Sequence, residues 1–321
     1  DERGLDPPRG GLAHADRQVD VADIVARRSP VEVVAHLGED GQRLLEHRLG
    51  GKQFRRALAV VADRVQHHGH IVAGDRPVAA AIVASYTGIP YSMEVRSIAF
   101  TAAELPALIA QSILLVTIQF AILVFLGMLL MKRIGLAAPI LDAVTKGEPA
   151  PANLRRVLLI SVATGVVAGL VVLGMDALFR PLLIKDLGDK ANALLPGAQP
   201  AAWKGFLASF TGAIVEELWM RLGAMSLLAW LGSFLRRTPD GKPTNAIFWI
   251  ANILAAAYFG YGHLAGLAAL VPLTALVVTR TLLGNAIAGI IFGRLYQTRG
   301  LESAMIAHFS ADIVLHVFAA L

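Results

Sequence analysis

Long runs of uncharged, apolar residues constrain this chain more than any other feature of its sequence. Residues 107–131 contain no charged side chain, and roughly 20 residues of helix, at 1.5 Å per residue, cross a hydrocarbon core of about 30 Å. Further apolar runs cover residues 157–179, 205–235, 243–293 and 303–321. Backbone N–H and C=O groups find no partner in lipid, so such runs must fold as helices. The sequence predicts an all-α, polytopic membrane bundle of about eight helices or half-helices.

The composition indicates a membrane protein and argues against a soluble domain, a nucleic-acid-binding protein and any site that depends on cysteine. Hydrophobic residues make up 55% of the 321 residues and charged residues only 17%, which is unlike a soluble domain. Basic residues scattered among apolar runs suit anionic lipid better than nucleic acid, so we expect a bilayer and no nucleic acid as a partner. The complete lack of cysteine excludes disulfides, thiolate zinc sites and cysteine nucleophiles.

The first 92 residues differ from the rest of the chain. They hold 12 basic and 12 acidic side chains, no methionine, and no apolar run long enough to span a bilayer. Two interpretations stay open: translation begins at Met93, or the segment is an amphipathic or partly disordered cytoplasmic extension with short helices near residues 40–49 and 53–66. In both, the chain divides into an extension, 1–92, and a membrane domain, 93–321, and the extension is dispensable.

The residues between the apolar runs predict topology. The loop after the first run is basic, which places it in the cytoplasm by the positive-inside rule; its basic residues are Lys132, Arg133, Lys146, Arg155 and Arg156. One straight helix over residues 205–235 would be about 46 Å long, so we expect a break or a strong tilt near residues 221–223, and we favour two helices over one. In residues 243–293, the break between spans is expected at Gly260, Gly262, Gly266 and Pro272. The expected location is a membrane, the plasma membrane if the source is prokaryotic.

A few ionisable residues fall inside the apolar runs, where each needs a partner, a water-filled space or a function. In one run, Glu217 and Arg221 are spaced i,i+4 and can pair, while Glu216 points about 100° away. An unpaired, partly desolvated carboxylate is a strong base, as a general base for water must be. The spacing therefore predicts Glu216 as a catalytic base and the Glu217–Arg221 pair as structural support.

The last run carries His308, Asp312 and His316 at i, i+4 and i+8, along one helix face. Asp312 can accept a hydrogen bond from His308 and fix its tautomer. His316 is interpreted as a helix-terminal histidine. Arg280 is another ionisable residue in an apolar run, and Asn285 is interpreted as an interhelical contact in a run of small residues.

Three motifs in this order resemble those of the CPBP (CAAX protease and bacteriocin-processing, Abi) intramembrane endopeptidases, which include the Ras-converting CAAX prenyl endopeptidase. The motifs are Glu216-Glu217-x-x-x-Arg221, Phe259-x-x-x-His263 and His308-x-x-x-Asp312. The similarity extends over about residues 107–321 and leaves out residues 1–92. The resemblance implies that the helix bundle encloses a polar, water-accessible cavity. It also implies an intramembrane endopeptidase that cleaves a CAAX-like or other membrane-associated peptide, with a prenylated or lipid-anchored protein as substrate.

The resemblance also implies a role for each motif residue. Glu216 would activate water, His263 would share or position that water, and His308 would lie near the developing oxyanion. Asp312 departs from the family pattern, which often has Asn there: either it orients His308 as an anion, or it stays protonated and donates. We favour the protonated donor.

The sequence leaves two questions open: whether the site binds a metal, and whether the protein has another function. Glu216, His263 and His308 would be the ligands of a zinc alternative, but the sequence has no His-Glu-x-x-His spacing, and we expect no metal cofactor. The alternative functions are a non-proteolytic membrane partner or immunity protein on the same scaffold, and a proton-coupled transporter.

Overall fold

The computed structural model describes residues 75–96, 105–149, 151–194 and 199–321. The chain divides into two units, Asp1–Gly69 and His70–Leu321, and all described residues belong to the second. The helices expected near residues 40–49 and 53–66 lie outside the described residues.

Helices make up the described part of the chain, which confirms the all-α bundle. In chain order they are α4 (Asp75–Thr87), α5 (Ile89–Arg96), α6 (Leu105–Arg133), α7 (Pro139–Lys146), α8 (Leu154–Leu187), η1 (Gly188–Leu194), α9 (Ala202–Phe210), η3 (Thr211–Glu216), η4 (Leu218–Met225), α10 (Ser226–Gly232), α11 (Asn245–Ala268), α12 (Ala275–Arg299), α13 (Leu301–Asp312), η5 (Ile313–Val317) and η6 (Phe318–Ala320). The 3₁₀-helices are η1 and η6, and η3, η4 and η5 are π-helical. Within the described residues, five segments are long and apolar enough to cross a membrane: Ile113–Arg133, Leu154–Leu194, Asn245–Ala268, Ala275–Arg299 and Leu301–Ala320. The chain is a multi-pass membrane protein.

The expectation of two helices in residues 205–235 is wrong. Residues 202–232 form one continuous helix, here called the glutamate helix, in which α9, η3, η4 and α10 follow without a break. The residues at each junction, Thr211, Glu217 and Ser226, all have right-handed helical backbone angles. Wider π-helical turns over residues 211–216 and 218–225 take the place of the predicted break. Such turns often occur at functional sites in helices.

The break in residues 243–293 is shorter than the glycine pattern predicts. Gly260, Gly262 and Gly266 lie inside α11, and the chain leaves the helix only at residues 269–274, around Pro272. Thr274 then caps α12 by accepting a hydrogen bond from the backbone N–H of Val277, a common helix start. Proline cannot donate to a helix, which is why the connection forms at this point.

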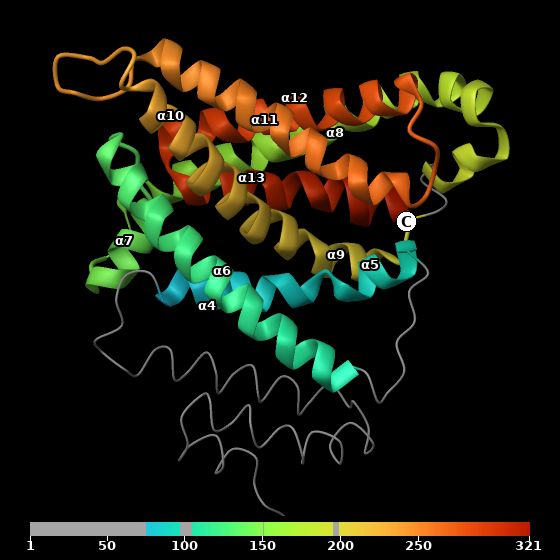
Figure 1. Ribbon diagram of the computed structural model, residues 1–321, viewed down its shortest axis with the longest axis horizontal. Helices are drawn as coiled ribbons and strands as arrows, with labels where there is room; N and C mark the ends of the chain where they lie inside the picture. The colour runs from blue at the N-terminus through green and yellow to red at the C-terminus, as the bar shows by residue number, and fades with distance from the viewer. Residues whose placement is uncertain (1–74, 97–104, 150, 195–198) are drawn as a thin grey trace, which may run out of the picture. The chain divides into compact units, whose positions relative to one another are not determined.

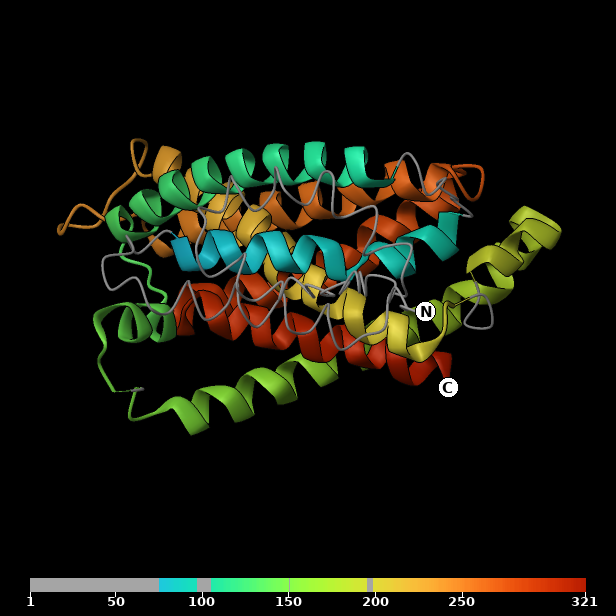
Figure 2. The ribbon, with the colours of Figure 1, turned by 90° about the horizontal axis from the view of Figure 1, so that it is seen from below.

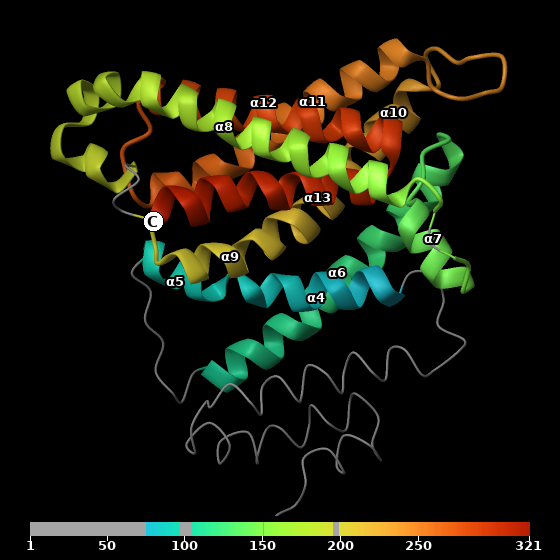
Figure 3. The ribbon, with the colours of Figure 1, turned by 180° about the vertical axis from the view of Figure 1, so that it is seen from behind.

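The glutamate helix lies inside the bundle. It packs on α13 and α11 on one side and on α4 and α6 on the other (Figure 1). Seen from below, it runs between α13 and the α4–α5 pair (Figure 2). Helix α8 covers the far side of α12 and α13 (Figure 3). Apolar side chains from the glutamate helix and its neighbours fill the core, among them Val124, Met131, Leu218, Met225 and Phe292.

Residues 75–92, expected in the extension, are part of this bundle. Ala81 and Ala84 of α4 are fully buried, and the Thr211 hydroxyl of the glutamate helix donates to the carbonyl oxygen of Ala84 over 2.6 Å. A Cβ atom at Gly88 would lie 2.7 Å from the Thr211 hydroxyl, so the helices approach closely there. The boundary expected between residues 92 and 93 therefore falls inside one packed unit, because small side chains on α4 let it dock on the glutamate helix.

Candidate active site

The two adjacent glutamates have different surroundings. The side chain of Glu217 is fully buried, and its Oε2 lies 3.2 Å from Nε of Arg221, whose side chain is 1% exposed. The Glu216 side chain is 35% exposed. The structure thus pairs Glu217 with Arg221, as the i,i+4 spacing predicts, and leaves Glu216 free of that pair.

Arg221 is held by more than its ion pair. Its Nη2 donates to the carbonyl oxygen of Gly289 over 3.0 Å, and its guanidinium carbon lies 5.6 Å and 5.7 Å from the ring centroids of Phe259 and Phe292, within cation–π range. Nη1 is buried with no hydrogen-bond partner among the described residues. This arginine therefore links three elements: the glutamate helix, α11 and α12.

His308 is the centre of the polar cluster. Its Nδ1 donates to Oε1 of Glu217 over 2.8 Å, and its Nε2 lies 3.8 Å from Oε2 of Glu216 and 3.6 Å from Oδ1 of Asp312. The carboxylate that accepts from the imidazole is therefore Glu217; orientation by Asp312 is the less favoured of the two roles considered for that residue. The reason is tertiary: α13 packs against the glutamate helix, so a carboxylate 91 positions away comes closer than the one a turn further along the same helix.

Asp312 is packed against the glutamate helix at a glycine. Its side chain is 11% exposed, and a Cβ atom at Gly212 would lie 2.4 Å from its Oδ2 and 3.2 Å from Nε2 of His308. A side chain at position 212 would therefore displace the Asp312 carboxylate from its present place. Gly212 is a site residue that the sequence reasoning missed, and its place one turn before the glutamates was the available signal.

Two phenylalanines enclose the His308 ring. Phe292 stacks on it with centroids 4.8 Å apart and planes at 25°, and Phe259 meets it edge to face at 5.9 Å. Phe259 belongs to a predicted motif, but Phe292 was not identified from the sequence. The apolar walls limit water around His308, which strengthens its interactions with nearby carboxylates.

His263 is the predicted site residue that the structure does not bring into the cluster. Its Nδ1 donates to the carbonyl oxygen of Phe259 over 2.9 Å, four residues earlier in α11. Its ring contacts Phe259 at 4.7 Å, and Phe259 in turn meets His308. Among the described residues, no hydrogen bond or ion pair joins His263 to Glu216 or His308. With Nδ1 as the donor, Nε2 is left as an acceptor.

His316 contacts Tyr91, a residue of the expected extension 1–92, and Gln199. The Tyr91 hydroxyl donates to Oε1 of Gln199 over 2.7 Å and lies 3.1 Å from Nδ1 of His316. Burial raises the pKa of Tyr91 to about 12, with a smaller contribution from Asp312, so this hydroxyl stays protonated. The three side chains tie α5 and the segment before α9 to the end of the last helix.

The other intramembrane polar residues lie apart from the cluster. Arg280 of α12 pairs with Asp176 of α8 through two hydrogen bonds of 2.8 Å and 2.5 Å. Asn285 donates to the carbonyl oxygen of Thr281 in its own helix and so does not form the predicted interhelical contact.

The geometry does not favour the zinc alternative. Within the described ranges, no group of three or more His, Asp or Glu side chains is arranged to hold a metal ion. His263 is directed to a backbone carbonyl, and Nδ1 of His308 is used by Glu217. The expected ligand set, Glu216, His263 and His308, does not converge.

Comparison with known proteins gives one finding. Residues 198–314 match the family model described as type II CAAX prenyl endopeptidase Rce1-like. No curated protein and no solved structure matches the chain. The match includes every residue of the three predicted motifs and is shorter than the expected similarity over residues 107–321. The family resemblance is thereby confirmed, and the chain carries an Rce1-like domain, a domain of a membrane protease family, in residues 198–314.

Proposed function

We propose that this protein is an intramembrane endopeptidase in which Glu216 activates water against a peptide bond. The observation that carries the proposal is the contrast between the two glutamates. Glu217 is fully buried and engaged by Arg221 and His308, while Glu216 is partly exposed 3.8 Å from Nε2 of His308. A carboxylate that water can reach, beside an oriented imidazole, has the arrangement of a general base with an electrostatic partner.

The proposed reaction needs no group beyond those of the chain and water. Glu216 takes a proton from water as the water oxygen attacks the carbonyl carbon of the substrate. His308, held at Nδ1 by Glu217, carries a second proton on Nε2 and donates it as a hydrogen bond to the oxyanion that forms. When the C–N bond breaks, the proton on Glu216 moves to the leaving nitrogen.

Asp312 and His263 have supporting roles in this proposal. Asp312, protonated in its buried position, donates to the oxyanion or orients it beside His308. Nε2 of His263 accepts a hydrogen bond from the attacking water once substrate is bound. The substrate class is a membrane-associated peptide, either a prenylated CAAX-like C-terminus, as the family description suggests, or another lipid-anchored segment.

The test is cleavage of a lipid-anchored peptide by the purified full-length protein in lipid nanodiscs. Glu216→Gln keeps the shape of the side chain and removes the base, so cleavage should fall at least about a hundredfold, the lower range for losing an acid-base group, with unchanged melting temperature. Asp240→Asn, at an exposed loop position, is the control and should cleave like the wild type. If Glu216→Gln keeps a tenth of the activity, Glu216 is not the base.

A chelator arm tests the metal question in the same assay. Incubation with 1,10-phenanthroline should leave cleavage unchanged. A loss that added zinc restores would show that the metal-free mechanism is wrong, whatever the Glu216 variant does.

A further inference from the structure

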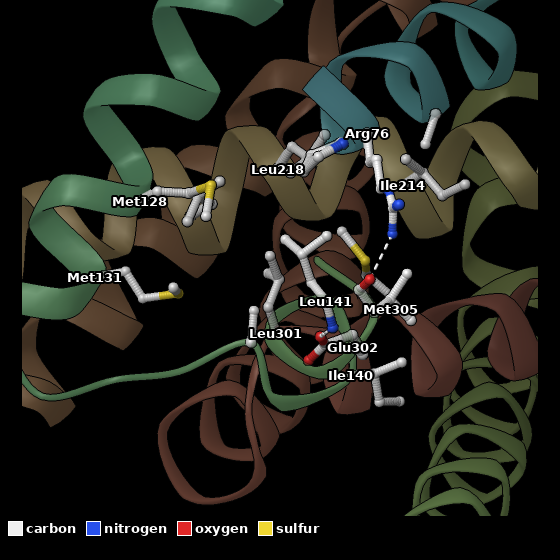
Figure 4. Close-up of a pocket in the computed structure, with 15 residues that line it drawn as sticks. Arg76, Met128, Met131, Ile140, Leu141, Ile214, Leu218, Leu301, Glu302 and Met305 are labelled. Atoms are coloured by element: carbon white, nitrogen blue, oxygen red, sulfur yellow. Dashed lines mark hydrogen bonds between the residues drawn. The ribbon is translucent and has the colours of Figure 1, made fainter. Parts of the chain in front are cut away.

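An apolar cavity of about 310 Å³ lies beside the glutamate helix, away from Glu216. Figure 4 shows its walls, which come from α4, α6, α7, α13 and the glutamate helix. The deep wall consists of Met128, Met131, Leu218, Leu222, Leu301 and Met305. Ala80 and Val144 also line the cavity and are exposed, so the cavity opens between α4 and α7.

The walls select an apolar and flexible occupant. An apolar cavity offers water too few hydrogen-bond partners, whereas apolar molecules regain the dispersion contacts that an empty space lacks. Three of the lining side chains are methionines, whose unbranched chains adapt to an irregular partner. In a membrane protein, the apolar component present in excess at such an opening is the acyl chain of a lipid.

The polar groups around the cavity indicate the head group. Arg76 lines it and donates from Nη1 to the carbonyl oxygen of Val144 over 2.7 Å, and its other nitrogens form no hydrogen bond with the residues that the structure describes (Figure 4). Glu302 also lines it. Its Oε1 accepts a hydrogen bond from the backbone N–H of Leu141 in α7, and its Oε2 is buried with no hydrogen-bond partner among the described residues.

The opening is at the basic end of the bundle. Exposed basic residues cluster at the helix ends there, among them Lys132, Arg133, Lys146, Arg155 and Arg156. Few acidic residues balance them: Asp142 and Glu148 are the acidic residues of the same loop. Anionic lipids of the cytoplasmic leaflet are attracted to such basic positions.

We propose that the cavity holds one acyl chain of an anionic glycerophospholipid whose phosphate binds Arg76. This lipid site is separate from the proposed peptide-bond chemistry and does not depend on it. Because Leu218 and Leu222 of the glutamate helix form part of the wall, the bound lipid stabilises the helix that carries Glu216.

The experiment uses the full chain in nanodiscs containing phosphatidylglycerol with a diazirine at the end of one acyl chain. After illumination, mass spectrometry locates the labelled residues. Labelling should concentrate on Met128, Met131 and Met305 rather than on the lipid-facing Leu115 and Ile122 of α6, which are more than half exposed. Labelling that is equal on both sets would contradict the site.

Two kinds of variant test the acyl-chain site and the phosphate site of the lipid separately. Ala80→Trp fills the cavity from its rim and should abolish labelling of the deep methionines; Val144→Trp, at a position 52% exposed, is a second filler that tests the same point if the first fails to fold. Arg76→Gln should reduce labelling about fivefold, as expected for one basic residue near an anionic surface. Arg236→Gln is the control and should leave labelling unchanged, since Arg236 is exposed but neither lines the cavity nor belongs to that basic cluster.

Three further results would overturn the proposal. Labelling that survives both filling variants places the lipid elsewhere. Equal labelling by a zwitterionic phosphatidylcholine probe removes the role of Arg76. Cross-links from the deep methionines to residues 1–74, in place of lipid, would show that this chain fills its own cavity.

Discussion

Two ion pairs in this bundle contrast in almost every physical respect. Glu217 and Arg221 lie one turn apart on a single helix, are 0% and 1% exposed, and approach to 3.2 Å without forming a hydrogen bond to each other. Asp176 and Arg280 join two different helices through two hydrogen bonds and are 29% and 22% exposed. The pair with the better geometry is the more exposed one.

The contrast indicates different functions for the two pairs. Removing charges from water costs more than an imperfect pair regains, so a buried ion pair is weak evidence of stabilisation. The free oxygen of Glu217 instead holds Nδ1 of His308. We interpret the buried pair as the support of the candidate site, and the α8–α12 pair as an ordinary contact between helices.

The largest expected effect comes from breaking the buried pair. Arg221→Met keeps much of the side-chain volume but leaves Glu217 buried and without its cation, and the free energy of unfolding should fall by about 3–5 kcal/mol. Chemical denaturation in detergent measures this. The variant should also lose peptide cleavage, because the uncompensated carboxylate no longer holds His308 in place.

A double-mutant cycle sharpens this prediction. The free energy of unfolding lost in the double variant Glu217→Gln/Arg221→Met should be smaller than the sum of the losses in the two single variants. Each single variant leaves one buried charge without its partner, whereas the double variant removes both charges of the pair. Additive losses would mean that the two side chains do not interact.

The next largest effect is expected at Asp312. Asp312→Asn removes the possible negative charge and keeps the shape of the side chain, so it tests which of the two the buried network requires. Since Glu217 already holds Nδ1 of His308, Asp312→Asn should keep cleavage within about tenfold of the wild type, well short of the loss of an acid-base group. Assays from pH 5 to 9 measure it. A drop of more than a hundredfold at every pH would show that an anionic Asp312 is required.

The smallest effect is expected at the exposed pair. Asp176→Asn removes an ion pair whose side chains are partly exposed near the start of α12, so stability should fall by about 1 kcal/mol or less, and cleavage should not change. Thermal unfolding in low and high salt checks this. The difference in melting temperature between the wild type and Asp176→Asn should shrink as salt screens the pair. A loss as large as that of Arg221→Met would remove the distinction between the two pairs.

Local spacing allowed several features to be predicted from the sequence. Uncharged runs required helices, because lipid offers the backbone no partners. The i,i+4 spacing paired Glu217 with Arg221 and left Glu216 aside, since helix geometry fixes which side chains on one helix are neighbours. The order of the three motifs identified the family.

The structure corrected predictions that depended on length and composition. A straight helix over residues 205–235 looked too long for the membrane, yet π-helical turns keep it continuous. Residues 75–92 looked dispensable because they carry no membrane span, yet Ala81 and Ala84 pack into the core. Neither feature leaves a periodic signal, because each depends on what the segment packs against.

By itself, the sequence determined the all-α membrane fold, the resemblance to the family whose model residues 198–314 match, and which residues pair within one helix. Only the tertiary structure decided which residues meet across helices: Glu217 with His308, Asp176 with Arg280, and Gly212 with Asp312. It also left His263 outside the cluster. The physical reason is that contacts between helices depend on the rotation and register of each helix against its neighbour. The packing of the whole bundle sets both, through small residues such as Gly212 that allow close approach.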